Sequence, residues 1–164
     1  ARTLLGRLYA SWSEDEGETW SVPEPTCLAA DGAPCAIRSI PQTQELLCVW
    51  CQLSPDEIRR GLRGNRLSAA ISKDGENWSH FQTLEWNPNI PKETYIAPEP
   101  QIKLTRSLDD VGLLQEGYVS SRYPSIAFLD NDEVLISYYH MTGYTDGNIF
   151  GATKNRILPL SWFY

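Results

Sequence analysis

The residues whose types and spacing best suit catalysis are Tyr123 and its neighbour Arg122, in the run Arg122-Tyr123-Pro124-Ser125-Ile126. A strand-like segment, residues 133–139, follows this run, so the pair is predicted to lie where the chain enters a β-sheet. A phenol becomes a nucleophile when a nearby base removes its proton. The alternative is that Tyr123 is only an aromatic side chain that packs at the start of a strand.

Length and charge restrict the possible functions. The chain has 164 residues and a net charge of −7, so it fits one core and is strongly acidic. Such a charge argues against nucleic acids and anionic membranes as partners. No apolar run reaches the roughly 18 residues that a membrane-spanning helix needs. An acidic protein can still bind an anion where its few arginines are concentrated.

The four cysteines are Cys27, Cys35, Cys48 and Cys51, and the last two have the spacing of a zinc motif. They lie, however, in an apolar run with high β propensity, where positions three apart point to opposite faces of a sheet. We therefore expect free thiols and no metal, with a Cys27–Cys35 disulfide as the alternative. Nothing in the sequence resembles a phosphate-binding loop or a dense ligand cluster, so no cofactor is expected.

The composition predicts an all-β fold. Six tryptophans, eight tyrosines, eleven glycines and eleven prolines, without a long helical period, are typical of short strands joined by turns. Two turns share one pattern, in residues 13–20 and 72–78, where Ser and Asp can bond the turn backbone and a glycine can adopt positive φ. Residues 39–50 and 125–138 form a second repeat. Antiparallel units that recur in this way indicate a β-propeller or a similar array.

These repeats suggest a division of the whole chain, residues 1–164. The predicted parts are a half blade, a full blade, an irregular insert with four prolines and a final blade: residues 1–27, 36–84, 85–121 and 122–164. About two and a half blades cannot close a ring, and open sheet edges invite pairing. We therefore expect another chain, or a missing N-terminal half, to complete the fold.

The segment Ser13–Trp20 matches the Asp-box S-x-D-x-G-x-T-W, and Ser72–Trp78 resembles its shortened form. Through these motifs the chain resembles the C-terminal half of bacterial exo-α-sialidases with Asp-box (BNR) repeats, in the sialidase (neuraminidase) superfamily. The resemblance implies a partial β-propeller, about two and a half blades of a six-bladed one. Asp-boxes lie on turns far from the active site, so Asp15 and Asp74 are expected to be structural.

The resemblance also implies roles for specific residues. Tyr123, in the family's Tyr-x-Ser context, would be the nucleophile of a retaining glycosidase. Arg2 and Arg66 match the second and third arginines of the clamp that binds the sugar carboxylate, and Arg122 adjoins the site. Guanidinium groups suit this task because they are planar, permanently charged and bidentate. A phenol avoids the repulsion that a carboxylate nucleophile would meet from the substrate's own carboxylate, and sialidases are the known exception to the two-carboxylate scheme.

Three family residues have no counterpart in this sequence: the first clamp arginine, the acid/base aspartate and the glutamate that assists the tyrosine. The chain is therefore expected to be incomplete as an enzyme. The implied partners are sialylated glycans or other acidic sugars, and the family suggests secretion or a periplasmic location. The alternative function is a non-catalytic glycan-binding or assembly module. His80 and His140 stand isolated in the sequence and are expected at surface or satisfied core positions.

Overall fold

The computed structural model describes residues 1–54, 57, 62–98, 119–143 and 149–164. Within these residues the chain forms nine strands and a C-terminal 3-10 helix: β1 (Arg7–Ala10), β2 (Glu24–Ala29), β3 (Ala36–Ser39), β4 (Leu46–Cys51), β5 (Arg66–Ser72), β6 (Trp78–Trp86), β7 (Val119–Phe128), β8 (Glu133–Gly143), β9 (Ile149–Pro159) and η2 (Leu160–Phe163). The prediction of an all-β fold is confirmed for this part of the chain.

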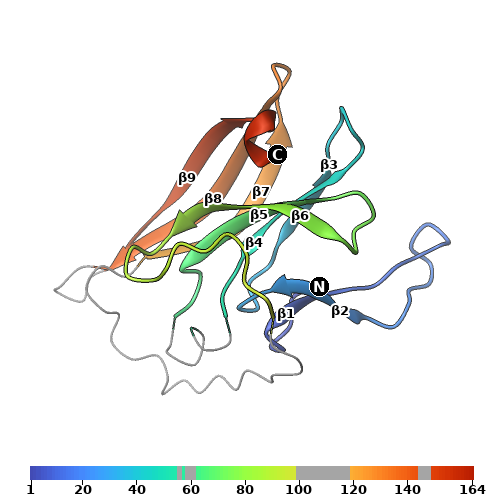
Figure 1. Ribbon diagram of the computed structural model, residues 1–164, viewed down its shortest axis with the longest axis horizontal. Helices are drawn as coiled ribbons and strands as arrows, with labels where there is room; N and C mark the ends of the chain where they lie inside the picture. Colours follow the sequence, from blue (N-terminus) through green and yellow to red (C-terminus); the bar gives the residue numbers. More distant parts are fainter. Residues whose placement is uncertain (55–56, 58–61, 99–118, 144–148) are drawn as a thin grey trace.

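The strands form three separate antiparallel sheets that follow one another across the molecule (Figure 1). They contain β1-β2, β3-β4-β5-β6 and β7-β8-β9, in chain order within each sheet. Strand β7 of the third sheet touches β3, β4, β5 and β6 of the second sheet, and side chains from β8 and β9 also bond to β6. Each sheet remains open at its edges.

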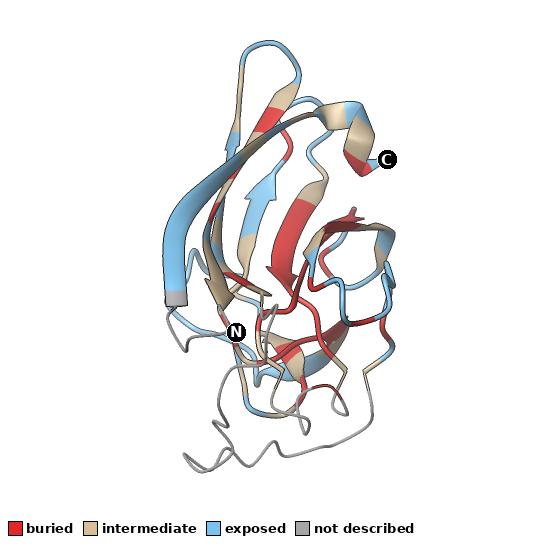
Figure 2. Cartoon of the chain, turned by 90° about the vertical axis from the view of Figure 1, so that its left-hand side faces the viewer, coloured by how far each residue is buried: buried red, intermediate tan, exposed pale blue. Residues whose placement is uncertain are grey.

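The two central strands of the second sheet, β4 and β5, are buried on both faces, and β4 shows how. Leu47, Val49 and Cys51 point into the larger apolar cluster, which lies between the second and third sheets and includes Ile136 and Tyr138. Cys48 and Trp50 point the other way, into the Trp50 cluster, which also contains Leu8, Leu28, Ala30 and Ala70. The prediction that Cys48 and Cys51 face opposite sides of the sheet is confirmed. Central strands are therefore buried, whereas the edge strand β9 is largely exposed (Figure 2).

The two Ser–Asp turns, residues 13–20 and 72–78, have the same hydrogen-bond pattern. In the first, Gly17 N donates to Ser13 Oγ at 2.7 Å, and Thr19 N donates to Asp15 Oδ1 at 2.8 Å. The second turn repeats these bonds with its own glycine, serine, asparagine and aspartate: Gly75 N to Ser72 Oγ, 2.8 Å, and Asn77 N to Asp74 Oδ1, 2.7 Å. In each turn the tryptophan indole N–H donates to the glycine carbonyl.

These bonds occupy both turn carboxylates. Hydrogen bonds from Thr19 lower the pKa of Asp15 to about 2, and hydrogen bonds from Asn77 lower the pKa of Asp74. A carboxylate that accepts several hydrogen bonds favours its charged form and remains an acceptor. This agrees with the structural role expected for Asp15 and Asp74.

Trp12 joins the first Ser–Asp turn region to the second turn. Gly75 has φ +79°, and a Cβ built there would lie 2.4 Å from the Trp12 ring. Only glycine therefore fits beneath this indole. Trp12 itself lies beyond strand β1, which ends at Ala10.

The boundaries of the predicted units shift in three places. The segment 85–121 is not irregular throughout, because Glu85 and Trp86 continue β6 and pair with Leu67 and Arg66. The last sheet begins at Val119 rather than at residue 122, since residues 119–121 pair with β8. The strands of the final predicted blade, residues 122–164, end with β9 at Pro159, and η2 follows. Residues 99–118 of the predicted insert lie outside the described residues.

Candidate functional site

The turn at Asp31 brings together the end of β2, the loop just before β5 and the start of β7. Asp31 is 1% exposed, and its Oδ2 accepts a hydrogen bond from Gly64 N at 2.8 Å. Gly64 O in turn accepts from Ser121 N at 2.7 Å. Gly64 has φ +62°, and a Cβ there would lie 2.5 Å from Ser120 Oγ and 2.6 Å from Arg122 Nε. Glycine is therefore required where β7 passes this close.

Arg122 is anchored within this group. Its Nε donates to Ser120 Oγ at 2.9 Å, and its Nη2 lies 3.8 Å from Asp31 Oδ2. The side chain keeps 19% of its surface exposed. The guanidinium is thus oriented by the protein and still reaches solvent, which a group that recognises an anion requires.

Tyr123 lies at a β-bulge inside β7. The register with β8 shifts between Arg122 and Ser125, and Tyr123 has φ +55°. Left-handed backbone is unfavourable for a bulky residue and is found mainly where the surrounding structure enforces it. The bulge leaves Tyr123 56% exposed. The sequence placed Tyr123 at the entrance to the strand, but β7 begins four residues earlier because Val119–Arg122 already pair with β8.

Arg2 lies on the same side of the molecule as Asp31. It is exposed and lines an open depression of about 380 Å³ together with Thr3, Leu4 and Gly32. Gly32 follows Asp31 directly, and Asp31 contacts Arg122. Two of the predicted arginines, Arg2 and Arg122, therefore approach the same Asp31–Gly32 turn.

Arg66 does not join them, because its guanidinium is fully buried at 0% exposure. Nη1 and Nη2 donate to the two carboxylate oxygens of Glu57 at 3.1 and 3.2 Å, and Nη2 also donates to Pro91 O at 2.7 Å. A protein carboxylate thus occupies the position expected for a ligand. Arg66 is not an ordinary exposed strand arginine either, because β5 is buried along its whole length.

Glu57 is a residue that the sequence reasoning missed, although a signal for it exists. Ser54 N donates to Glu57 Oε2 at 2.9 Å, and Glu57 N donates to Ser54 Oγ at 3.1 Å. This reciprocal pair is the capping box, whose sequence signature is serine followed three residues later by glutamate. Asp31 was also missed, and its only signal is the turn-forming dipeptide Asp31-Gly32.

The sequence also did not predict a contact of His140, whose Nδ1 lies 2.9 Å from Ser121 Oγ on the neighbouring strand. Burial, together with the charge of Lys154, lowers the pKa of His140. The other histidine, His80, is exposed and has its Nδ1 3.0 Å from the Tyr164 carbonyl. These positions agree with the surface or satisfied placement expected for both.

Lowering the pH should destabilise the fold through His140. The unfolded side chain has a pKa of about 6.5, and the folded one is lower, so below pH about 6.5 the unfolded chain binds the proton first. This contribution to stability is present above pH about 6.5 and is lost as pH falls through the folded pKa. We expect the free energy of unfolding, from urea titrations at pH about 7.5 and about 5.5, to fall further for the wild type than for His140→Gln. Equal losses would contradict this role of His140.

The described residues give no sign of a metal centre or a membrane helix. No group of three or more His, Cys, Asp or Glu side chains among them could hold a metal ion. No helix in the part of the chain that the structure describes is long and apolar enough to cross a membrane. All four cysteines are free, so the alternative of a Cys27–Cys35 disulfide is wrong for this structure.

No protein-family model matches the chain, and no curated protein is similar to it. The class of the protein therefore rests on its own geometry: an all-β chain of three successive antiparallel sheets, with an anchored arginine beside a solvent-exposed tyrosine.

Proposed function

We propose that the chain is part of a retaining exo-α-sialidase, a glycoside hydrolase that releases terminal sialic acids from glycoconjugates. The observation that carries the proposal is the exposed side chain of Tyr123 at a bulge with positive φ, directly after Arg122, whose guanidinium is anchored beside Asp31. In this proposal Tyr123 Oη attacks the anomeric carbon, the glycan departs as an alcohol, and water releases the sugar from the tyrosine.

Arg2 and Arg122 would bind the substrate carboxylate in this mechanism. Both approach the Asp31–Gly32 turn, and Asp31 orients Arg122. A bound carboxylate would accept charge-assisted hydrogen bonds from the two guanidinium groups, which offset its repulsion by the acidic protein. Arg66 remains the third candidate, and its participation requires a ligand carboxylate to replace Glu57.

A propeller architecture is part of the same proposal. Its support is the succession of three antiparallel sheets and the repetition of the Ser–Asp turn before β2 and before β6. About two and a half blades of six would be present, because the sheets contain two, four and three strands. Another chain, or further sequence of the same protein, would supply the remaining blades, the acid/base aspartate and the glutamate that assists Tyr123. Secretion or a periplasmic location is the matching expectation.

One observation favours the second candidate, a non-catalytic glycan-binding or assembly module. The bidentate pair between Arg66 and Glu57 gives this arginine a structural role and removes one member of the expected clamp. A module of this kind would retain a sialoside through Arg2 and Arg122 without cleaving it.

The test is hydrolysis of a panel of fluorogenic glycosides by the complete protein. We expect turnover of α-sialosides and of no neutral sugar, and a roughly 10- to 150-fold lower kcat/KM for Arg122→Gln, the effect of losing a hydrogen bond to a charged group. The matched control is Arg38→Gln, since Arg38 lies on β3 and its described contact is with its neighbour's carbonyl, Ile37 O. Sialoside binding without turnover would favour the second candidate, and neither binding nor turnover would contradict both.

A further inference from the structure

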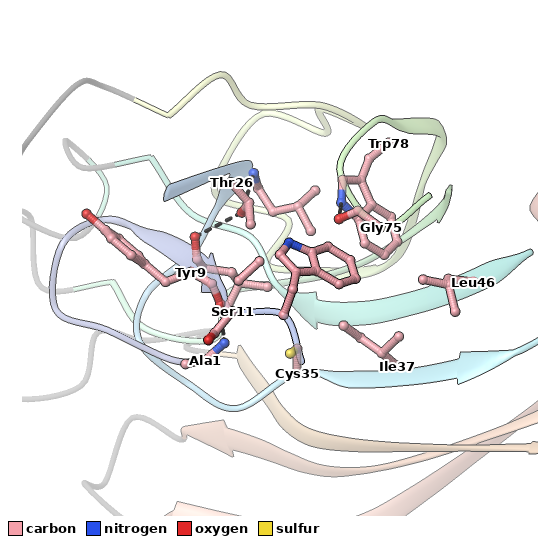
Figure 3. A pocket seen from close by; sticks show the side chains of 13 residues that line it. Ala1, Tyr9, Ser11, Thr26, Cys35, Ile37, Leu46, Gly75 and Trp78 are labelled. Carbon is pink, nitrogen blue, oxygen red and sulfur yellow. Dashed lines mark hydrogen bonds between the residues drawn. The ribbon is translucent and has the colours of Figure 1, made fainter. Parts of the chain in front are cut away.

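A small apolar pocket lies between the first two sheets, away from the Asp31 turn. Its volume is about 260 Å³, and its wall combines β1 and β2 residues with β3, β4 and the second Ser–Asp turn. Figure 3 shows the sulfur of Cys35 at one side, with Ile37 and Leu46 beside it and Gly75 and Trp78 across from it. A small uncharged molecule that enters this pocket therefore meets a thiol.

Cys35 does not stand alone, because Cys48 lies behind it. Cys48 is fully buried in β4, and the pairing of β3 with β4 sets Ile37 opposite Cys48, with Cys35 diagonal to it on the same face. The two sulfurs lie close enough to influence each other's ionisation. Both belong to the Trp50 cluster, Cys48 as a member and Cys35 packed against it. The pair thus consists of one sulfur that is accessible from the pocket and one that is shielded.

The environment also separates the two sulfurs chemically. The hydrogen bond from Cys48 lowers the pKa of Cys35 to about 7, whereas burial raises the pKa of Cys48. The thiolate is the reactive form, so Cys35 is the expected nucleophile of the pair and Cys48 the expected resolving cysteine.

We propose that Cys35 and Cys48 form a peroxide-oxidisable dithiol, in which Cys35 reacts with a hydroperoxide in the pocket and Cys48 then closes a disulfide with it. The site lies outside the proposed sialidase site and does not depend on it. Diagonal neighbours on adjacent strands are about 7–8 Å apart, so the segment of Cys35, which directly precedes β3, must move toward β4 to reach the S–S distance of about 2.05 Å.

The proposed chemistry balances with a hydroperoxide as the oxidant. The Cys35 thiolate attacks the O–O bond, an S–O bond forms, and hydroxide leaves from hydrogen peroxide, so sulfur is oxidised to a sulfenic acid and the peroxide is reduced. The Cys48 sulfur then attacks the Cys35 sulfur, the S–O bond breaks, and the hydroxyl leaves as water with the Cys48 proton. A dithiol reductant then reduces the disulfide to the two thiols by thiol–disulfide exchange and is itself oxidised to a disulfide.

The experiment treats the chain with hydrogen peroxide, blocks the remaining thiols and determines the mass and the linked residues without reduction. Cys27→Ser/Cys51→Ser retains only the proposed pair, and we expect it to lose two hydrogens on treatment and to regain them with dithiothreitol. Cys48→Ser should instead hold Cys35 as a sulfenic acid that a dimedone probe captures. Before oxidation, iodoacetamide at pH about 7 should label Cys35 roughly tenfold faster than Cys51, which is buried in the larger apolar cluster.

Three results would overturn the proposal. A disulfide between Cys35 and Cys27 in the wild type would show that Cys27, and not Cys48, is the resolving cysteine, since Cys27 also packs against the Trp50 cluster. Equal labelling of Cys35 and Cys51 would show that the pocket gives no access. An unchanged mass of Cys27→Ser/Cys51→Ser after peroxide, with circular dichroism matching the wild type, would show that the pair does not react.

Discussion

Replacing Tyr123 by phenylalanine in the complete protein should lower kcat for α-sialosides by about 10³-fold or more, the scale of losing a catalytic nucleophile. The substitution removes one oxygen and keeps the ring that the bulge exposes, so the fold and the arginines around Asp31 should remain. The affinity for sialic acid should therefore stay within a few-fold of the wild type. Steady-state kinetics and calorimetric titration measure the two quantities separately.

Tyr139→Phe is the matched control for this variant. Tyr139 lies on β8 directly opposite Arg122, and it is also exposed, at 39%. It should lose little activity, because the sequence and the structure give it no nucleophilic role. An unchanged kcat in Tyr123→Phe, or an equal loss in Tyr139→Phe, would contradict the assignment of Tyr123.

Glu57→Ala should lower the free energy of unfolding by about 3–5 kcal/mol. The variant leaves the guanidinium of Arg66 charged and fully buried without its carboxylate partner. The Nε of Arg66 already has no hydrogen-bond partner among the described residues, so few groups can replace the hydrogen bonds that Glu57 accepts. Urea denaturation, followed by tryptophan fluorescence to which the buried Trp50 contributes, measures the change.

Two further variants test why Glu57 matters. Lys73→Ala removes one partner of the ion pair with Glu45, and with Lys73 86% exposed it should cost less than about 1 kcal/mol. Arg66→Met with Glu57→Leu replaces the buried pair by apolar side chains and should regain most of the lost stability. If Glu57→Ala costs no more than Lys73→Ala and instead strengthens sialoside binding, Arg66 is a ligand-binding residue that Glu57 masks.

The features that the sequence predicted are local ones. The Ser–Asp turns need only residues within eight positions of one another, so their pattern is visible in the chain itself. The opposite directions of Cys48 and Cys51 follow from the two-residue period of a strand. The position of Arg122 beside Tyr123 is likewise given by adjacency.

The features that escaped prediction depend on contacts between sheets. Arg66 begins a strand with an unremarkable pattern, and its burial follows from the packing of β5 within a sheet covered on both faces. Asp31 is joined to Gly64 and Arg122 only after three distant segments converge. The early start of β7 depends on its pairing with β8, which the residues before Arg122 do not signal by themselves. Register and burial of this kind are properties of the assembled sheets.

The isolation of β1 and β2 in a two-stranded sheet divides the molecule into cooperative units of unequal strength. A two-stranded ribbon is marginally stable by itself, so this sheet depends on the contacts of Leu8 and Leu28 with Trp50. The other two sheets share the larger apolar cluster and unfold at a greater cost. Opening of the β1–β2 unit is therefore expected to cost less than unfolding of the other two sheets, and it uncovers the face of β4 that carries Cys48. Local opening, rather than global unfolding, would then set how fast reagents too large for the pocket reach this buried thiol.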